Sequence, residues 1–245
     1  MITIIRKSIL LFIGSIIIYS LVLFFRNNDA DSINRFLIDS DSTFLNNNTI
    51  ERILEDKIKE DSSRINYNDL ENTLMSNPHV KSVKIYKDLS GNLNVSLDQY
   101  EPVARIVSGS HSKKYIDSHG EMFPISRNFT ERVILIHLSN KINFIDNNLN
   151  NTQFGRKIME MINYISNDDF LVKIISEIDV DKNKNIIIHP QLSKQKIIFG
   201  YPVDLDEKFN KIMIFYEKIA PLKGWNTYKT VNVKFKNQIV CDKIV

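Results

Sequence analysis

The chain has 245 residues, of which 43% are hydrophobic and 25% charged, a composition typical of a globular protein rather than a disordered one. Lysine and arginine number 32 against 29 aspartate and glutamate residues, and this near balance argues against a dedicated nucleic-acid-binding protein. A single cysteine, Cys241, excludes an intrachain disulfide framework and a zinc site built from cysteines.

An apolar segment lies close to the N-terminus of the sequence. Residues 8–25 contain no charged side chain, and as a helix they would be about 27 Å long, close to the thickness of a bilayer's hydrocarbon core. A cleaved signal peptide is the alternative, but its apolar core is normally about 7–15 residues long and ends at a small-x-small site. The segment 24–27, Phe-Phe-Arg-Asn, offers no such site. We therefore expect an uncleaved single-pass anchor in the lipid bilayer.

The flanks of this segment bear on its orientation. Two basic residues lie in the tail before it and two shortly after it, so the positive-inside rule gives a nearly even count. A seven-residue tail followed by a long folded region nevertheless fits a cytoplasmic N-terminus. We expect residues 1–7 to form a cytoplasmic tail and the chain from residue 26 onward to be exported.

After a polar linker at 26–36, the segment 37–101 has the pattern of one module built as strand, helix, helix, strand and strand. Capping signals at Asn48–Glu51 and Asn68–Glu71 each precede apolar residues at helical spacing. Pro78 ends the second helix, because the residue before a proline disfavours the helical conformation. Alternating apolar residues on both sides of a turn at 88–92 then predict a β-hairpin.

The segment 102–245 has the pattern of a mixed β domain with flanking helices, so the expected fold class is α+β. Gly120 stands where a tight hairpin over Tyr115–Pro124 requires a positive φ. The other expected elements are a strand at 133–136, a helix at 152–165, a hairpin of 174–180 with 186–189, a strand at 197–200, a helix from 204 to about 220 and a final strand at 230–240.

The final strand is one-sidedly apolar. Val231, Val233 and Phe235 would point to one face, and Lys234 and Lys236 to the other. At an exposed sheet edge, such a strand offers unpaired N–H and C=O groups to an incoming strand of a partner. An internal strand that only holds the sheet together is the alternative, and periodicity does not decide between them.

No motif for catalysis, cofactor binding or metal binding stands out, so we expect no enzyme activity, cofactor, metal ion or small-molecule substrate. The sequence Asp179-x-Asp181-x-Asn183 begins like a calcium loop, but Lys184 and Pro190 occupy the positions that need glycine and glutamate. A turn between two strands accounts for this pattern.

One group of titratable residues keeps an enzyme among the alternatives. His111 and His119, together with Asp117, could meet across a hairpin. Polar residues at the surface near a turn are the commoner outcome when no ligand-spacing motif is present. A membrane-tethered envelope enzyme would require a pocket around these three residues.

Several stretches of the sequence together resemble the bacterial cell-division family FtsQ/DivIB. The module at 37–101 resembles a POTRA domain, and 102–245 resembles the family's β domain. The most specific signal is the exit Glu101–Ala104 followed by the hairpin that begins at Tyr115. The stretches that carry the resemblance are Leu74–Ile85, Leu97–Ala104, Tyr115–Pro124, Phe199–Phe209 and Val231–Val240.

The resemblance implies a non-catalytic scaffold of the divisome that links early and late division proteins in support of septal peptidoglycan synthesis. Its implied partners are FtsB and FtsL, together with FtsW and FtsI, and its implied location is the cell inner membrane at the division septum. A POTRA-type polypeptide-binding chaperone of envelope assembly is a further alternative.

The resemblance also implies contact residues, because the family's C-terminal β-strand takes up a strand from FtsB. Carried onto this sequence, the contact covers Thr230, Val231, Asn232, Val233, Lys234, Phe235, Lys236, Asn237, Gln238 and Ile239. A second candidate contact in the POTRA module comprises Val80, Lys81, Val83 and Ile85. Val233→Pro or Phe235→Ala is then expected to prevent capture of the partner.

Overall fold

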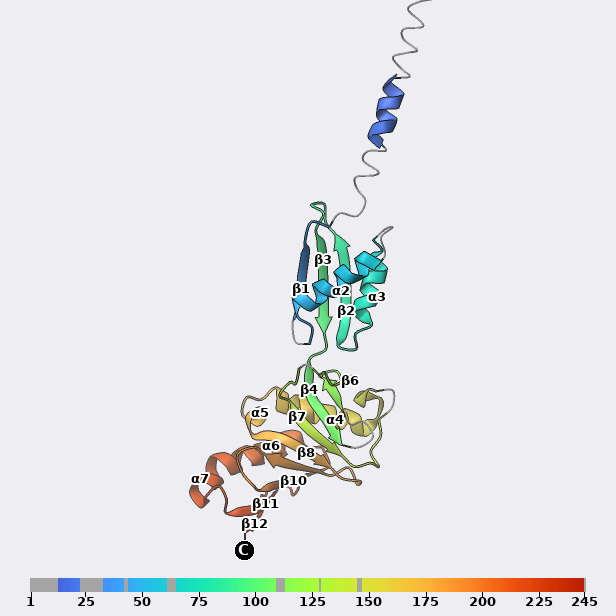
Figure 1. Cartoon of the computed structure of the whole chain (residues 1–245). Coiled ribbons are helices and arrows are strands. Elements are labelled where there is room, and N and C mark those ends of the chain that lie inside the picture. The colour runs from blue at the N-terminus through green and yellow to red at the C-terminus, as the bar shows by residue number, and fades with distance from the viewer. Residues whose placement is uncertain are drawn as a thin grey trace, which may run out of the picture. The chain divides into compact units, whose positions relative to one another are not determined.

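The computed structural model describes residues 13–22, 33–41, 44–60, 65–108, 113–127, 129–144 and 147–244. Residues 13–22 are helical, and the rest forms two compact units that divide between Gln99 and Tyr100 (Figure 1). Of the segment predicted to cross the membrane, residues 8–12 and 23–25 lie outside the described residues. No helix in the described part of the chain is both long and apolar enough to span a bilayer, so the membrane anchor stays a prediction.

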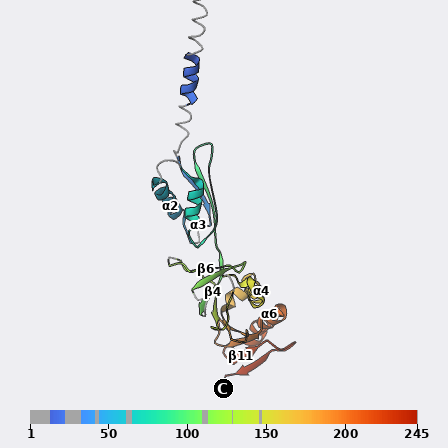
Figure 2. The ribbon, with the colours of Figure 1, turned by 90° about the vertical axis from the view of Figure 1, so that its right-hand side faces the viewer.

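The first unit contains a three-stranded sheet and two helices in the order predicted from the sequence. Its elements are β1 (Phe36–Ser40), α2 (Asn47–Glu60), α3 (Tyr67–Met75), β2 (Val80–Lys87) and β3 (Leu93–Gln99). β3 lies in the centre of the sheet, antiparallel to β2 and parallel to β1. Both helices cover one face of the sheet (Figure 1 and Figure 2). The most deeply buried side chains of its core, at most 3% exposed, are Ile50, Leu54, Leu70, Leu74, Leu93, Val95 and Leu97.

Both helices begin earlier than their predicted capping signals. The side chain of Asn46, not that of Asn48, accepts the hydrogen bond from the N–H of Thr49, at 2.8 Å. Asn66 caps α3 by accepting from the N–H of Asn68 at 3.1 Å. Asparagine is a good cap at any of several neighbouring positions, so a run of asparagines does not by itself fix the first residue of a helix.

The second unit is built around a nine-stranded sheet. The strand order is β12-β11-β10-β9-β8-β7-β4-β5-β6, and β4, β7 and β8 run parallel to one another. Its elements are β4 (Pro102–Ser108), β5 (Lys114–Asp117), β6 (Met122–Pro124), β7 (Ile134–Leu138), the 3₁₀ turn η1 (Leu149–Asn151), α4 (Gln153–Ser166), α5 (Leu171–Ile174), β8 (Ile175–Val180), β9 (Ile186–Pro190), β10 (Lys196–Gly200), α6 (Leu205–Ile214), the π-helical turn η2 (Phe215–Ile219), α7 (Ala220–Lys223), β11 (Tyr228–Asn232) and β12 (Val240–Lys243).

The core of the second unit lies between the sheet and the helices α4 and α6, which occupy the same side of it (Figure 2). Buried residues of α4 recur at helical spacing, as the sequence predicts: Phe154, Ile158, Met161, Ile162 and Ile165. The hairpin expected over Tyr115–Pro124 is confirmed, because β5 and β6 pair antiparallel and Gly120 has a φ of 82°.

The single final strand predicted at 230–240 is wrong. The chain forms β11, leaves the sheet after Val233, whose N–H still donates to Ile198 of β10, and returns antiparallel to β11 as β12. Val231 and Val233 are buried as the alternation predicts, but Phe235 is 45% exposed. The physical reasons are a buried lysine of α6 that takes up the main-chain oxygens of Val233 and Phe235, and a left-handed residue, Asn237, with a φ of 57°.

Candidate functional site

The large sheet ends, on the C-terminal side, in a strand with one neighbour. Among the described strands, β12 pairs with β11 alone, whereas β11 also pairs with β10, in parallel. The N–H of Ile244 donates to the oxygen of Thr227 at 3.1 Å. Because hydrogen-bonding direction alternates along a strand, the N–H groups of Cys241 and Lys243 face away from β11. β12 therefore presents an open backbone edge.

The connection between β11 and β12 is fixed by α6. The ammonium of Lys211 donates to the oxygens of Val233 at 3.2 Å and Phe235 at 2.5 Å, and pairs with the carboxylate of Glu207 at 2.7 Å. Its three N–H groups are thus matched by three acceptors, which is how a lysine that is only 7% exposed avoids an unpaired buried charge. The position of the connection is set by side chains of α6.

Glu207 connects the same helix to the far end of this connection. Its carboxylate accepts a hydrogen bond from the N–H of Asn237 at 2.8 Å. The pKa of Glu207 lies below its usual value, chiefly because of the hydrogen bond from Lys211, with the Asn237 N–H as a further cause. Lys211 and Glu207, one helical turn apart in α6, therefore bind the first residues of the connection and its chain reversal at Asn237.

The ten residues predicted as a partner strand divide into three environments. Thr230, Val231 and Asn232 lie within β11, where the hydroxyl of Thr230 contacts Asp242 of β12 at 2.5 Å. Val233 is fully buried and Ile239 is half-buried against the core. The remaining five are exposed in the connection: Lys234, Phe235, Lys236, Asn237 and Gln238.

Sequence reasoning missed β12 itself. Its signals are weak: one short apolar pair, Val240–Cys241, follows the left-handed Asn237, which tolerates the reversal of the chain. The surface near β12 is partly apolar. Val240, the first residue of the strand, is 40% exposed, and Phe235 in the preceding connection is also exposed. Burial raises the pKa of the Cys241 thiol, and the charge of Asp242 adds to the effect.

In the second predicted contact, on β2, the apolar side chains face the core, although β2 is an edge strand that, among the described strands, pairs with β3 alone. Val80 and Ile85 are at most 5% exposed and belong to the core of the first unit, and Val83 packs against that core. Lys81 alone of the four is exposed. The N–H of Ile85 donates to the carboxylate of Glu71 on α3 at 2.7 Å, so one main-chain donor of this edge already has an acceptor.

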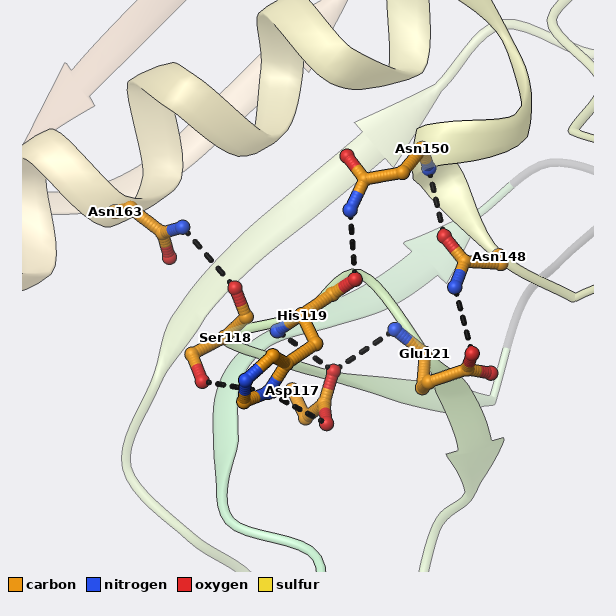
Figure 3. Close-up of polar contacts among 7 residues, drawn as sticks. All are labelled: Asp117, Ser118, His119, Glu121, Asn148, Asn150 and Asn163. Atoms are coloured by element: carbon orange, nitrogen blue, oxygen red, sulfur yellow. Dashed lines mark hydrogen bonds and ion pairs between the residues drawn. The ribbon is translucent and has the colours of Figure 1, made fainter.

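The residues that could have formed an enzyme site have structural contacts (Figure 3). One carboxylate oxygen of Asp117, a residue only 3% exposed, accepts hydrogen bonds from the N–H groups of His119 at 2.9 Å and Glu121 at 2.8 Å. The imidazole of His119 is 72% exposed, and His111 lies outside the described residues. Asp117 therefore closes the β5–β6 turn.

Three asparagines brace the same turn. The side chains of Asn150 and Asn163 donate to the oxygens of His119 at 2.7 Å and Ser118 at 3.1 Å, and Asn148 donates to the carboxylate of Glu121 at 2.6 Å (Figure 3). These side chains come from η1, the residue that caps it and α4, so the cluster ties the β5–β6 hairpin to the helical part of the unit.

A row of polar residues on the sheet also lacks the geometry of a catalytic triad. The Ser108 hydroxyl lies 3.5 Å from Nδ1 of His137, whose Nε2 lies 3.8 Å from the carboxylate of Glu177. Both distances exceed the range of about 2.6–3.2 Å that joins a nucleophile to its base. Asp181, from the rejected calcium pattern, accepts from the N–H groups of Asn183 and Asn185 and so caps the turn between β8 and β9.

Two family models match the chain, and their ranges correspond to the two structural units. A family model described as FtsQ/DivIB, C-terminal related, matches residues 101–242, which is more than half of the chain. A model of a POTRA-like domain matches residues 37–98. No curated protein matches the sequence. The fold, the order of the two matches and the extent of the first show that the chain belongs to the FtsQ/DivIB family of cell-division proteins.

Proposed function

We propose that the chain is a non-catalytic scaffold of the bacterial divisome, which links early and late division proteins at the septum. Its membership of a cell-division family supports this role. The site geometry also supports it, because the carboxylate of Asp117, singled out from the sequence, caps the β5–β6 turn.

The proposal includes an anchor in the cell inner membrane formed by residues 8–25. The uncharged sequence of this segment supports it, as do the described helical residues, whose apolar side chains such as Ile16, Ile18 and Val22 are at least 53% exposed. In this arrangement residues 1–7 are cytoplasmic, 26–36 form a linker, and the domains at 37–101 and 102–245 lie outside the cytoplasm.

The proposed contact is strand addition to β12. The observation that carries it is the open backbone edge of β12, with outward N–H groups at Cys241 and Lys243. An extended segment of FtsB, in complex with FtsL, would pair with this edge and cover the exposed side chains of Phe235 and Val240. FtsW and FtsI are the proposed downstream partners.

The test is a proline at an outward position of the edge. Cys241→Pro removes a donor that faces the partner while leaving the β11 ladder intact. We expect it to weaken binding of co-reconstituted FtsB and FtsL to the full-length chain by about tenfold or more, because a main-chain hydrogen bond contributes about 0.5–1.5 kcal/mol and the ring also obstructs the incoming strand.

Cys241→Ala is the matched control, since it keeps the N–H and changes only the side chain. It should bind FtsB and FtsL as the unaltered chain does. Circular dichroism establishes that both variants are folded. Equal binding by a folded Cys241→Pro variant would contradict strand addition at β12.

A further inference from the structure

A cavity of about 700 Å³ lies in the second unit, far along the sheet from β12. It opens at the start of the three parallel strands β4, β7 and β8, and the segment 130–133 forms one wall. Its apolar lining comes from Val103, Val133, Leu135 and Val172. The volume falls within the range of about 300–1,000 Å³ that small ligands occupy in proteins.

Arg105 projects into this cavity from β4. Its Nε is buried and has no hydrogen-bond partner. The guanidinium carbon lies 6.0 Å from the ring centre of Tyr115 on the neighbouring β5, at the outer limit of a cation–π contact. The Tyr115 hydroxyl accepts from the N–H of Glu131 at 3.2 Å, which fixes the wall segment beside the arginine. The guanidinium therefore lies beside the Tyr115 ring, and its buried Nε lacks an acceptor within the described part of the chain.

The two carboxylates of the lining leave Arg105 uncompensated. Glu177 is in register with Leu135, which is in register with Arg105, so the two charged residues are two strands apart, about 10 Å between backbones. The Glu177 carboxylate instead faces the imidazole of His137 at 3.8 Å. The carboxylate of Glu131 accepts from the N–H of Arg132 at 3.3 Å. Neither glutamate forms an ion pair with Arg105.

We propose that this cavity binds an extended peptide segment of a partner protein through one carboxylate, with an aliphatic side chain beside it. A guanidinium presents paired N–H donors that match the two oxygens of a carboxylate. The aliphatic walls would cover the neighbouring side chain, and Arg132 stands exposed in the lining as a second positive charge. β9, β10 and β11 separate this site from β12, so the proposal does not depend on strand addition there.

The test compares two capped dipeptides, N-acetyl-Leu-Glu-amide and N-acetyl-Leu-Gln-amide, which differ in the charge of one side chain. Each is added to the full-length chain in detergent micelles while the methyl signals of Val103 and Leu135 are followed by NMR. We expect the glutamate peptide to bind at least about tenfold more tightly, with a dissociation constant no weaker than roughly 10 mM, and to shift these signals. Arg105→Gln should abolish the difference between the two peptides.

Arg127→Gln is the matched control, because Arg127 is exposed in the same unit and outside the cavity lining. It should leave both affinities unchanged. Leu135→Phe, which fills the cavity and keeps Arg105, should weaken the glutamate peptide and gives a second test if Arg105→Gln does not fold. Equal binding of the two peptides, or no methyl shift up to about 10 mM, would overturn the proposal. Acetate binding as tightly as the glutamate peptide would overturn its peptide part.

Discussion

The ammonium nitrogen of Lys211, in α6, lies 2.5 Å from the main-chain oxygen of Phe235, in the connection that leads to β12. A helix that covers the sheet thus also holds the segment from which the edge strand starts. The contact joins the buried core to an exposed surface, because Lys211 is 7% exposed and Phe235 is 45% exposed. Lys211 therefore links the core to the connection that leads into β12.

Lys211→Met should destabilise the second unit by about 2–4 kcal/mol. The substitution keeps an unbranched side chain but leaves the oxygens of Val233 and Phe235 without their shared donor, and each unsatisfied buried group costs about 1–3 kcal/mol. Denaturant unfolding can be followed by the fluorescence of Trp225, the chain's one tryptophan, which stacks on Tyr216 at 6.0 Å in this unit.

Lys218→Met is the control for this substitution, because Lys218 is exposed on η2. Its effect should stay within about 0.5 kcal/mol. The same loss of stability in both variants would show that Lys211 stabilises the unit through its positive charge alone and not through its hydrogen bonds to the two main-chain oxygens.

Acid should release the turn at Asn237. The folded-state pKa of Glu207 is depressed below its ordinary 4.5, so its stabilising contribution is present above the unfolded-state pKa and is lost as the pH falls through the lower folded-state pKa. Amide exchange of the Asn237 N–H, corrected for intrinsic exchange, should lose protection over that acidic range. Glu207→Gln should remove this dependence on pH, and an unchanged profile in that variant would contradict the assignment.

The sequence predicts most elements because their apolar periodicity is strong, as in α4, where five buried residues follow the helical repeat. The end of the chain cannot be predicted from local alternation, because the connection contacts Lys211, a residue distant in sequence whose contact leaves no local signal. Val233→Pro, the obvious test from the alternation, is unsuitable: the N–H of Val233 donates to Ile198 at 3.1 Å within the sheet, so proline would damage the fold itself.

The cavity beside Arg105 was not predictable for a related reason. Its lining comes from five separate stretches of the chain. No local sequence pattern indicates that Arg105 lacks a carboxylate partner on the neighbouring strands. Ion pairing depends on strand order, and the parallel placement of β4 next to β7 is a tertiary feature.

Asp117→Ala should destabilise the second unit by about 1–2 kcal/mol, whereas His119→Ala should change stability by less than about 0.5 kcal/mol. Asp117 accepts two main-chain N–H groups in the β5–β6 turn, while the imidazole of His119 is mostly exposed. The Trp225 signal in a denaturant titration measures both. Equal losses of stability in the two variants would indicate that Asp117 stabilises the unit through the His119 imidazole and not through its hydrogen bonds to the main chain of the turn.

In the first unit, Ile85→Ala should cost about 2–4 kcal/mol, because it opens a cavity in a core where Ile85 is 5% exposed. Amide exchange of β2 and β3 measures the loss. Lys81→Ala, on the exposed face of the same strand, should leave exchange unchanged. If only Ile85→Ala loses binding to a partner protein, the loss reports unfolding of the unit. If Lys81→Ala loses binding, Lys81 lies in a surface contact.

Cys241 allows the edge to be measured chemically, because it is the chain's one cysteine. Burial, and then the charge of Asp242, raise the pKa of its thiol, so the reactive thiolate is a smaller fraction at a given pH than in an unfolded chain. Alkylation by iodoacetamide near neutral pH should be slower in the folded chain than in denaturant, and Asp242→Asn should raise the folded-chain rate. A strand paired with β12 should slow alkylation further, since it covers the edge on which Cys241 lies. Equal rates with and without bound FtsB and FtsL would mean that the partner binds elsewhere on the unit.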